Sequence, residues 1–450
     1  MTAILLFGLF AILVLLQVPI AISLAASSLV VLFLNWGPSS FTLLPDILYA
    51  SVSKFTLLSI PFFILAGVIM EYAGISKRLI NFAYACVGHY KSGMIFVTVL
   101  TAIFFAAISG SGPATVAAIG GILIPALVKN GMKKESASAL LASSGAIGIV
   151  IPPSIAMIVF AIVAGGQLNI SIERLFLAGV IPGILLGVGF IVAAIYVRNK
   201  DVSVITAKEQ ENMSTKFGIV AGASDLEKTK DIARAFKDAI WGLLMPVIIL
   251  GGIYGGVFTP TEAAVVAVFY GFFVGVFIYK DLKLNTIYKI LYEAGAQTAV
   301  IMLIVSSASL FAYIITTEQI AQSMADSMLA LSSNPIVILL LINLILLIAG
   351  AFIDAVSAFY IFVPILTPII LSLNVDPTVF GVFMTVNLAI GLFTPPVGVN
   401  LYVASGIGRV KLYQISKSTL PFLISAIIVL LLITFIPSIS TYLPNLLGVK

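Results

Sequence analysis

Long uncharged runs alternate along the chain with short charged segments. Most runs are about 17 residues or longer, the length that a helix needs to cross a bilayer. A segment at 198–238 breaks the series, because charged residues of both signs are dense in it, and it predicts a hinge between two halves. The uncharged runs are 1–45, 55–70, 92–128, 136–172, 175–197, 239–261, 263–279, 294–317, 327–353, 355–375, 377–408 and 418–449.

The composition indicates that these runs lie in a lipid bilayer. Hydrophobic residues make up 61% of the 450 positions and charged residues only 9%, so the chain is predicted to be a polytopic membrane protein. The net charge of +5 comes from basic residues in loops and indicates no nucleic-acid partner. A single cysteine, Cys86, and a single histidine, His89, exclude a disulfide framework and zinc or haem sites. The start, MTAILLFGLF, is typical of a first span and not of a signal peptide.

Two adjacent prolines interrupt an apolar run once in each half. Residues 145–157 read GAIGIVIPPSIAM and residues 388–400 read LAIGLFTPPVGVN. Further proline-centred segments match at the same spacing of about 240 residues, which indicates an internal duplication. The predicted halves are 1–197 and 239–450. The matching positions are Ala146, Ile147, Gly148, Pro152 and Pro153 with Ala389, Ile390, Gly391, Pro395 and Pro396; Pro125 with Pro364; and Pro19 with Pro260.

The run 92–128 has lysines at both ends, Lys91 on one side and Lys129 on the other, so both ends are predicted to be cytoplasmic. One helix of this length would reach about 55 Å, too long for a hydrocarbon core of about 30 Å. Its centre, ISGSGPAT (108–115), cannot continue a helix. We therefore expect a hairpin that enters the membrane partway and returns.

The run 335–375 is interrupted at AGAFIDAVSA (349–358). No lysine or arginine lies between Lys289 and Arg409, whereas acidic residues do, so both ends of this run are predicted to lie outside. One hairpin then enters from each face, and the two halves form an inverted repeat.

Each hairpin precedes a broken helix, at 136–165 and at 377–407. Helix-breaking residues persist at membrane depth only where the freed backbone groups face protein, water or ions. We expect each break to lie beside the tip of its hairpin, where carbonyls suit Na⁺ and helix N-termini suit a carboxylate. A proline kink tolerated by packing is the alternative, and the paired occurrence disfavours it.

The resulting architecture is an all-α membrane protein with ten spans, two re-entrant hairpins and two broken helices. Both termini are expected to be periplasmic and the 198–238 linker cytoplasmic. Besides the two broken helices, the spans are 2–18, 20–34, 55–72 and 174–197 in the first half, and 239–258, 262–279, 296–316 and 418–440 in the second.

Several segments together resemble the large membrane subunit of TRAP transporters, the DctM family. The resemblance covers almost the whole chain. Among the members of the family, the transporters of sialic acid look the most similar to this sequence. It implies a sodium-coupled, elevator-type importer of organic acids in the bacterial inner membrane, similar in fold to divalent-anion/sodium symporters. It also implies a separate small four-helix membrane subunit and a periplasmic substrate-binding protein. The segments are SIPFFILAGVIMEYAGI (59–75), ISGSGPATVAAIGGILIP (108–125), the break from Gly148 to Pro153, FTPTEAA (258–264) and LFTPPVGVNLYVASGI (392–407).

Pairing each hairpin tip with its break gives two candidate Na⁺ sites. No lysine or arginine lies inside the predicted core, so a substrate carboxylate would be held by helix termini, hydroxyls and the bound ions. Sialic acid, other sugar acids and C4-dicarboxylates are all compatible. The first site comprises Ser109, Gly110, Ser111, Gly148 and Pro152; the second comprises Gly350, Asp354, Gly391 and Thr394; the substrate would lie between them near Ser111, Thr115, Ser154, Ser357 and Asn400.

Some of these residues have a purely structural alternative. Asp354 either binds sodium in a polar network or caps a helix at the tip. The hydroxyls at the first tip fit helix capping equally well. Asn400 either binds substrate or ties the broken helix to its neighbour. Glu262, although acidic in an apolar setting, is predicted to close a capping box with Thr259.

Three other function classes fit parts of the pattern. A stand-alone sodium/carboxylate symporter would also bind ions and substrate at broken helices. It differs because it needs no binding protein. An intramembrane serine protease would pair Ser111 with His89, which are predicted at different depths in the membrane. A passive channel suits two opposed hairpins less well than alternating access does.

Overall fold

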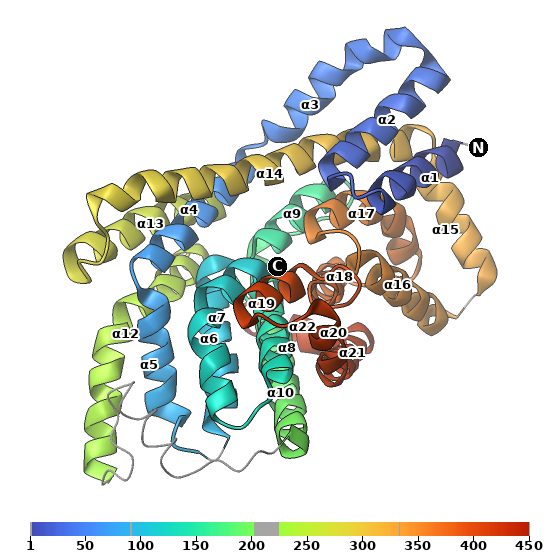
Figure 1. The fold of residues 1–450 in the computed structure, drawn as a ribbon. Helices are drawn as coiled ribbons and strands as arrows, with labels where there is room; N and C mark the ends of the chain where they lie inside the picture. Colours follow the sequence, from blue (N-terminus) through green and yellow to red (C-terminus); the bar gives the residue numbers. More distant parts are fainter. Residues whose placement is uncertain (1, 91, 202–224, 333, 450) are drawn as a thin grey trace.

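The computed structural model describes residues 2–90, 92–201, 225–332 and 334–449, and the regular secondary structure within these ranges is entirely helical. Figure 1 shows the arrangement of the helices. In chain order they are α1 (Thr2–Leu15), α2 (Ile20–Trp36), η1 (Pro38–Leu43), α3 (Leu44–Val52), η2 (Phe55–Leu58), α4 (Ser59–Tyr72), α5 (Ile75–Val87), α6 (Gly93–Ser109), α7 (Gly112–Lys129), α8 (Lys134–Gly145), η3 (Ala146–Ile149), α9 (Ile155–Ala164), α10 (Ile172–Asp201), α12 (Asp225–Tyr254), α13 (Pro260–Phe273), η4 (Val274–Ile278), α14 (Leu284–Thr317), α15 (Ile320–Leu331), α16 (Pro335–Gly350), α17 (Ala355–Ser372), α18 (Pro377–Gly391), α19 (Val399–Gly408), α20 (Leu412–Ser418), α21 (Leu420–Phe435) and α22 (Ser438–Leu446).

Seven of the described helices are long and apolar enough to cross a bilayer, which confirms a polytopic membrane protein. Five of them correspond to predicted spans, at 55–72, 172–201, 231–254, 260–278 and 285–317. The other two, α7 and α17, are hairpin legs of 18 residues each. A leg of this length reaches about 27 Å, longer than we expected for a hairpin that enters partway. The depth and direction of both hairpins therefore stay predictions.

The sequence pattern missed several of the described helices. Among them are α5 and α15, each of which lies directly before a hairpin. Lys77 and Arg78 belong to α5. Both helices bury one face only: the buried positions of α5 include Ile75, Leu79 and Ala83, each four residues after the one before. Such amphipathic helices carry charge on the other face and leave no uncharged run.

The predicted polar linker is helical at both ends. Helix α10 continues to Asp201 and α12 begins at Asp225, and residues 202–224 lie outside the described ranges. At Thr259 the predicted capping box is confirmed. Its hydroxyl accepts a hydrogen bond from Glu262 N at 3.3 Å, and the Glu262 carboxylate accepts one from Thr259 N at 2.8 Å.

Two groups of helices position the candidate site. Helices α4, α13 and α14 pack together, with α2 and α3 also against α14, along one side of the molecule in Figure 1. The hairpins and broken helices form the second group, and there the two halves interlock. Helix α19 of the second half packs against α7 and α8 of the first, and α9 of the first half packs against α17 of the second. Each broken helix thus contacts the hairpin of the opposite half.

Candidate transport site

The first hairpin turns at residues 109–111, here called the first tip. Gly110 has a φ of 60°, in the left-handed region that favours glycine, and this lets α6 end and α7 begin with a minimal connection. A Cβ at Gly110 would lie 2.8 Å from the Pro153 carbonyl oxygen. The first tip therefore lies directly against the double proline, as the sequence predicts.

The backbone of Gly148 touches the first tip as well. A Cβ there would lie 2.6 Å from the Ser111 carbonyl oxygen and 3.0 Å from Thr115 Oγ1. Only a residue without a side chain allows this approach. The structure thus brings four predicted members of the first sodium site together: Ser109, Gly110, Ser111 and Gly148.

Hydroxyl groups at the first tip form a local network. Thr115 Oγ1 donates to the Ser111 carbonyl at 2.7 Å and lies 3.0 Å from Ser109 Oγ. Ser109 Oγ in turn donates to the same carbonyl at 3.3 Å. Thr115 is fully buried. These contacts bring together oxygen atoms of Ser109, Ser111 and Thr115, which are hard ligands of the type that alkali and alkaline-earth cations prefer.

The first break comprises residues 150–154, and the Pro152–Pro153 peptide bond in it is cis. Ser154 ends the break as the N-cap of α9. Its hydroxyl accepts from Met157 N at 3.2 Å and donates to the Ile149 carbonyl at 2.5 Å. Ser154, predicted to lie near the substrate, has its hydroxyl engaged in closing the helix end.

The second tip (residues 350–354) and the second break (residues 392–398) lie together, and their contact includes a close backbone approach beside the break. A Cβ at Gly391 would lie 2.3 Å from the Gly350 carbonyl oxygen, so the two glycines are in direct contact. A hydrogen bond from Val397 N to the Ala351 carbonyl, at 3.3 Å, continues the contact. Thr394 Oγ1 donates to the Ile390 carbonyl at 2.6 Å. Gly350, Gly391 and Thr394 therefore lie in one region, as the sequence predicts.

Asp354 is the N-cap of α17. Its two carboxylate oxygens accept hydrogen bonds from Ser357, one from the backbone N at 3.1 Å and one from the hydroxyl at 2.6 Å. This is the capping role that the sequence left open beside a sodium role. Ser357, predicted to contact substrate, is fully buried and directs its hydroxyl to Asp354. Sodium binding at Asp354 stays a prediction.

Asn400 connects the two halves at the site. Its side-chain amide donates to the Ala142 carbonyl of α8 at 2.9 Å and lies against the backbone of Gly112 and Gly145. This is the tie to a neighbouring helix that was one of the two predicted roles. Its Oδ1 is fully buried and accepts no hydrogen bond from the described protein atoms. Asn400 thus joins the surroundings of the first tip to the start of α19.

A cavity of about 50 Å³, which was not predicted from the sequence, lies between the first tip on one side and helices α4 and α14 on the other. Glu71 of α4 and Gln297 of α14 line it together with Ser109 and Ser111. Glu71 lies in the last turn of α4. Gln297 carries the only side-chain amide in the uncharged run 294–317, and this was the sequence signal that could have found it.

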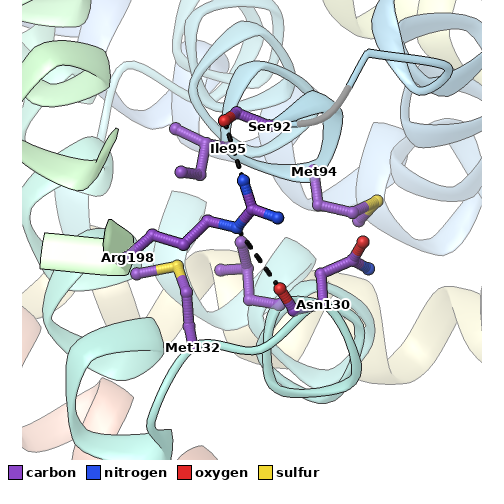
Figure 2. Close-up of a pocket in the computed structure, with 7 residues that line it drawn as sticks. Ser92, Met94, Ile95, Asn130, Met132 and Arg198 are labelled. Carbon is purple, nitrogen blue, oxygen red and sulfur yellow. Dashed lines mark hydrogen bonds between the residues drawn. The ribbon is translucent and has the colours of Figure 1, made fainter. Parts of the chain in front are cut away.

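Helix α10 holds the base of the first hairpin. Arg198 donates to Ser92 Oγ at 3.0 Å and to the Asn130 carbonyl at 3.4 Å, and so joins the start of α6 to the end of α7. Figure 2 shows its guanidinium between these two residues, with Met94 and Met132 nearby. Asp201 accepts from Lys133 N at 3.2 Å. Both legs are thereby fixed at the end opposite to the tip.

At its other end, α10 contacts the second half. Arg174 donates to Thr378 Oγ1 at 2.9 Å, to Asn445 Oδ1 at 3.1 Å and to the Val449 carbonyl at 2.6 Å. Its guanidinium also lies 3.7 Å from the carboxylate of Asp376. One arginine therefore fastens the start of α18 and the end of the described chain to the start of α10.

Comparison with known proteins agrees with this architecture. The family model "Tripartite ATP-independent periplasmic transporter, DctM component" matches residues 7–439. The chain belongs to the DctM family of TRAP transporters. The family resemblance predicted from the motifs is thus confirmed, and because the relatives are transporter permeases, the chain is not an enzyme.

Individual DctM relatives are named for different organic anions. The chain is 42% identical to the isethionate TRAP transporter permease DctMQ of Oleidesulfovibrio alaskensis, over 97% of this chain and 65% of that one, so it spans under two thirds of that relative. It is 41% identical to the C4-dicarboxylate large permease DctM of Vibrio cholerae, over 96% and 94%. The sialic-acid large permease SiaM of Vibrio cholerae is 37% identical over 88% and 87%. The sialic-acid permease is the least similar of these three relatives. The identities therefore do not support the prediction that this chain resembles the sialic-acid members most.

A solved structure shares the fold. The YdaH transporter of Alcanivorax borkumensis superimposes with a TM-score of 0.59 over 92% of this chain and 89% of that one, at 15% sequence identity. At this identity the likeness concerns the fold alone.

Proposed function

We propose that this DctM-family chain takes up an organic acid with sodium ions, as the large membrane subunit of a tripartite transporter in the bacterial inner membrane. The observation that carries the proposal is the contact of each hairpin tip with a helix break. Gly148 meets Ser111 in one half, and Gly391 meets Gly350 in the other. Paired interruptions in two halves of a transporter are the best sequence pointer to its binding site.

An anionic substrate suits the helix ends that gather here. Helices α7, α9, α17 and α19 all begin at a tip or a break, and the positive end of a helix dipole favours negative charge. Relatives named for isethionate, C4-dicarboxylates and sialic acid are consistent with an organic acid. We propose this substrate class and leave the individual acid to measurement.

Two sodium ions would balance the charge of the substrate. Two Na⁺ with a dianion make an electroneutral cargo, and two Na⁺ with a monoanion carry positive charge inward. An inside-negative membrane potential, about 2.3 kcal/mol per charge per 100 mV, would then drive uptake of the monoanion. The oxygen-rich first tip and the backbone contact of the second tip are the proposed ion sites.

An elevator movement would carry the hairpins past the α4–α13–α14 group. Part of the contact between the two groups is a close backbone approach: a Cβ at Gly67 of α4 would lie 3.4 Å from the Cα of Ser109. Close backbone approach without interlocking side chains is typical of helix contacts in membranes. The cavity beside Glu71 and Gln297 lies at this same boundary.

The test is reconstitution in liposomes. The chain alone is expected to transport nothing, and addition of a small membrane subunit and a loaded periplasmic binding protein is expected to give uptake. Accumulation of substrate by the purified chain alone would instead indicate a stand-alone symporter.

Sodium coupling is measured in the assembled system by varying external Na⁺. Two sites predict a sigmoidal response with a Hill coefficient above one. A Hill coefficient of one, or full uptake in Na⁺-free buffer with a proton gradient, would contradict the two-ion proposal.

A further inference from the structure

Three buried polar side chains connect the second hairpin, the second broken helix and α21. Asn387 of α18 donates its side-chain amide to both the backbone carbonyl and Oδ1 of Asn343 of α16, each at 3.0 Å. Asn343 in turn donates to Thr434 Oγ1 of α21 at 3.1 Å. All three residues are at most 4% exposed. We call this group the amide latch.

The amide latch lies close to the contact between the second tip and the second break. Asn387 precedes Gly391 by about one helical turn, and Asn343 precedes Gly350 by about two. The two contacts, Asn343 with Asn387 and Gly350 with Gly391, therefore follow one another in the same direction along α16 and α18. The position of one fixes the position of the other.

Polar residues are an unusual choice for this interface if stability alone matters. Replacing a buried polar pair by apolar residues of similar volume is often neutral or stabilising. Asn387 Oδ1 even lacks a partner among the described protein atoms, which adds a desolvation cost. What buried amides supply is specificity, because a single buried asparagine can fix the register of two helices.

Among the described residues, the first half has no corresponding hydrogen bond. The double-proline frame aligns Ser144 with Asn387, each two residues before the shared alanine, and Thr101 lies about two turns before the first tip, as Asn343 does before the second. Both hydroxyls are fully buried, and neither has a hydrogen-bond partner among the described atoms.

We propose that the amide latch sets the register of α16 against α18 and thereby positions the Gly350 and Gly391 backbones for ion binding. The proposal rests on the proposed function for its consequence, namely sodium affinity. Its structural content, the register, is independent of that function. Asn343, Asn387 and Thr434 are positioning residues that need not touch the ion or the substrate.

The first experiment measures register without transport. In a Cys86→Ser background, cysteines replace Ala351 and Val397, whose backbones are hydrogen-bonded and so near enough for oxidative cross-linking. Efficient cross-linking is expected with the latch intact. Adding Asn343→Leu with Asn387→Leu is expected to lower the yield to about half or less, since apolar side chains tolerate several registers. An unchanged yield would overturn the proposal.

The second experiment measures Na⁺ dependence in the assembled transporter. The double variant Asn343→Leu/Asn387→Leu is expected to keep a melting temperature close to wild type, and its half-saturating Na⁺ concentration is expected to rise about fivefold to tenfold, the size of one buried hydrogen bond. Thr434→Val should give a smaller rise, and Thr434→Ser, which keeps the hydroxyl, should restore the wild-type value. A folded double variant with unchanged Na⁺ dependence would refute the positioning role.

The matched control uses the first half. Thr101→Val and Ser144→Ala remove hydroxyls that have no partner, so both the cross-linking yield and the Na⁺ dependence should stay at wild-type values. Changes there as large as those at the amide latch would overturn the assignment to the second half. Sodium-independent uptake by the wild type would refute the proposed function. The proposal on helix register would then be tested by the cross-linking comparison alone.

Discussion

The two hairpin tips reach the same arrangement with different chemistry. The first tip carries hydroxyls, turns at a left-handed glycine and presents the Ser111 carbonyl to Gly148. The second tip has a bare glycine-to-glycine contact and a carboxylate, Asp354, that caps the following helix. The first hairpin is also held at its base by Arg198, whereas the second is held along its leg by Asn343 and Asn387.

This difference shows that a duplicated architecture constrains the backbone more than the side chains. Both halves keep a close approach of tip and break, because the geometry requires it. The polar groups around the two contacts differ in type, number and position. Two ion sites built on these tips would differ in ligand chemistry, and matched substitutions in the two halves should have unequal effects.

The largest expected effect concerns the faces from which the hairpins enter. In a Cys86→Ser background, single cysteines replace Lys134 near the first hairpin and Asn334 at the start of the second; both positions are exposed. An impermeant thiol reagent added to intact cells should label the second and not the first, an all-or-none difference. Equal labelling of both, or labelling of the first alone, would contradict the inverted arrangement.

The glycines at the two contacts are expected to give the next largest effect. Gly391→Ala places a Cβ 2.3 Å from the Gly350 carbonyl oxygen, and Gly148→Ala places one 2.6 Å from the Ser111 carbonyl oxygen. Overpacking of this kind costs about 1–3 kcal/mol, so uptake should fall about tenfold to a hundredfold, more at Gly391 than at Gly148.

Uptake by the assembled transporter and the yield of folded protein measure this effect. Gly121→Ala in α7 and Gly406→Ala in α19 are the controls, because a Cβ at either meets nothing within 4 Å. A Gly391→Ala variant with wild-type uptake would show that the second contact is dispensable.

The smallest effect separates the two roles of Asp354. Asparagine caps helices about as well as aspartate, so Asp354→Asn keeps the cap and removes the charge. If the carboxylate binds sodium, the half-saturating Na⁺ concentration should rise in Asp354→Asn and in Asp354→Ala alike.

In the first half, Ser154→Ala removes only a helix cap. It should lower the free energy of unfolding by about 1 kcal/mol, measured as a lower melting temperature.

Should Asp354→Asn retain the wild-type Na⁺ response while Asp354→Ala only lowers the melting temperature, Asp354 is a helix cap and the second ion site has no carboxylate ligand. The two tips would then be more alike in charge than the sequence suggests.

Much of the fold was predictable because the bilayer imposes it. Uncharged runs predicted the long helices, and the double prolines predicted breaks at 150–154 and 392–398. Helices α5 and α15 were missed because a helix with one buried face carries charges that resemble a loop in a hydropathy pattern.

The candidate site was predictable at the level of its backbone and less so for its side chains. Glycines and prolines signal where the chain must turn or approach closely, so Gly148 and Gly391 could be paired with the tips in advance. Hydrogen-bond partners follow from packing between distant segments. The contact of Asn400 with the Ala142 carbonyl, 258 residues away, and the pairing of Asn387 with Asn343 therefore emerged only from the structure.

The contacts of Arg174 have a consequence for the order of events during synthesis. Its partners Asn445 and Val449 follow it by 271 and 275 residues, so the ribosome makes them long after α10 has formed. At a chain growth rate of about 5–20 residues per second, the guanidinium lacks these two partners for about 14 to 54 s. During that interval water or lipid headgroups must solvate it. This contact can therefore form completely only after residue 449 has been made, and a nascent chain arrested before residue 445 should leave the start of α10 open to protease.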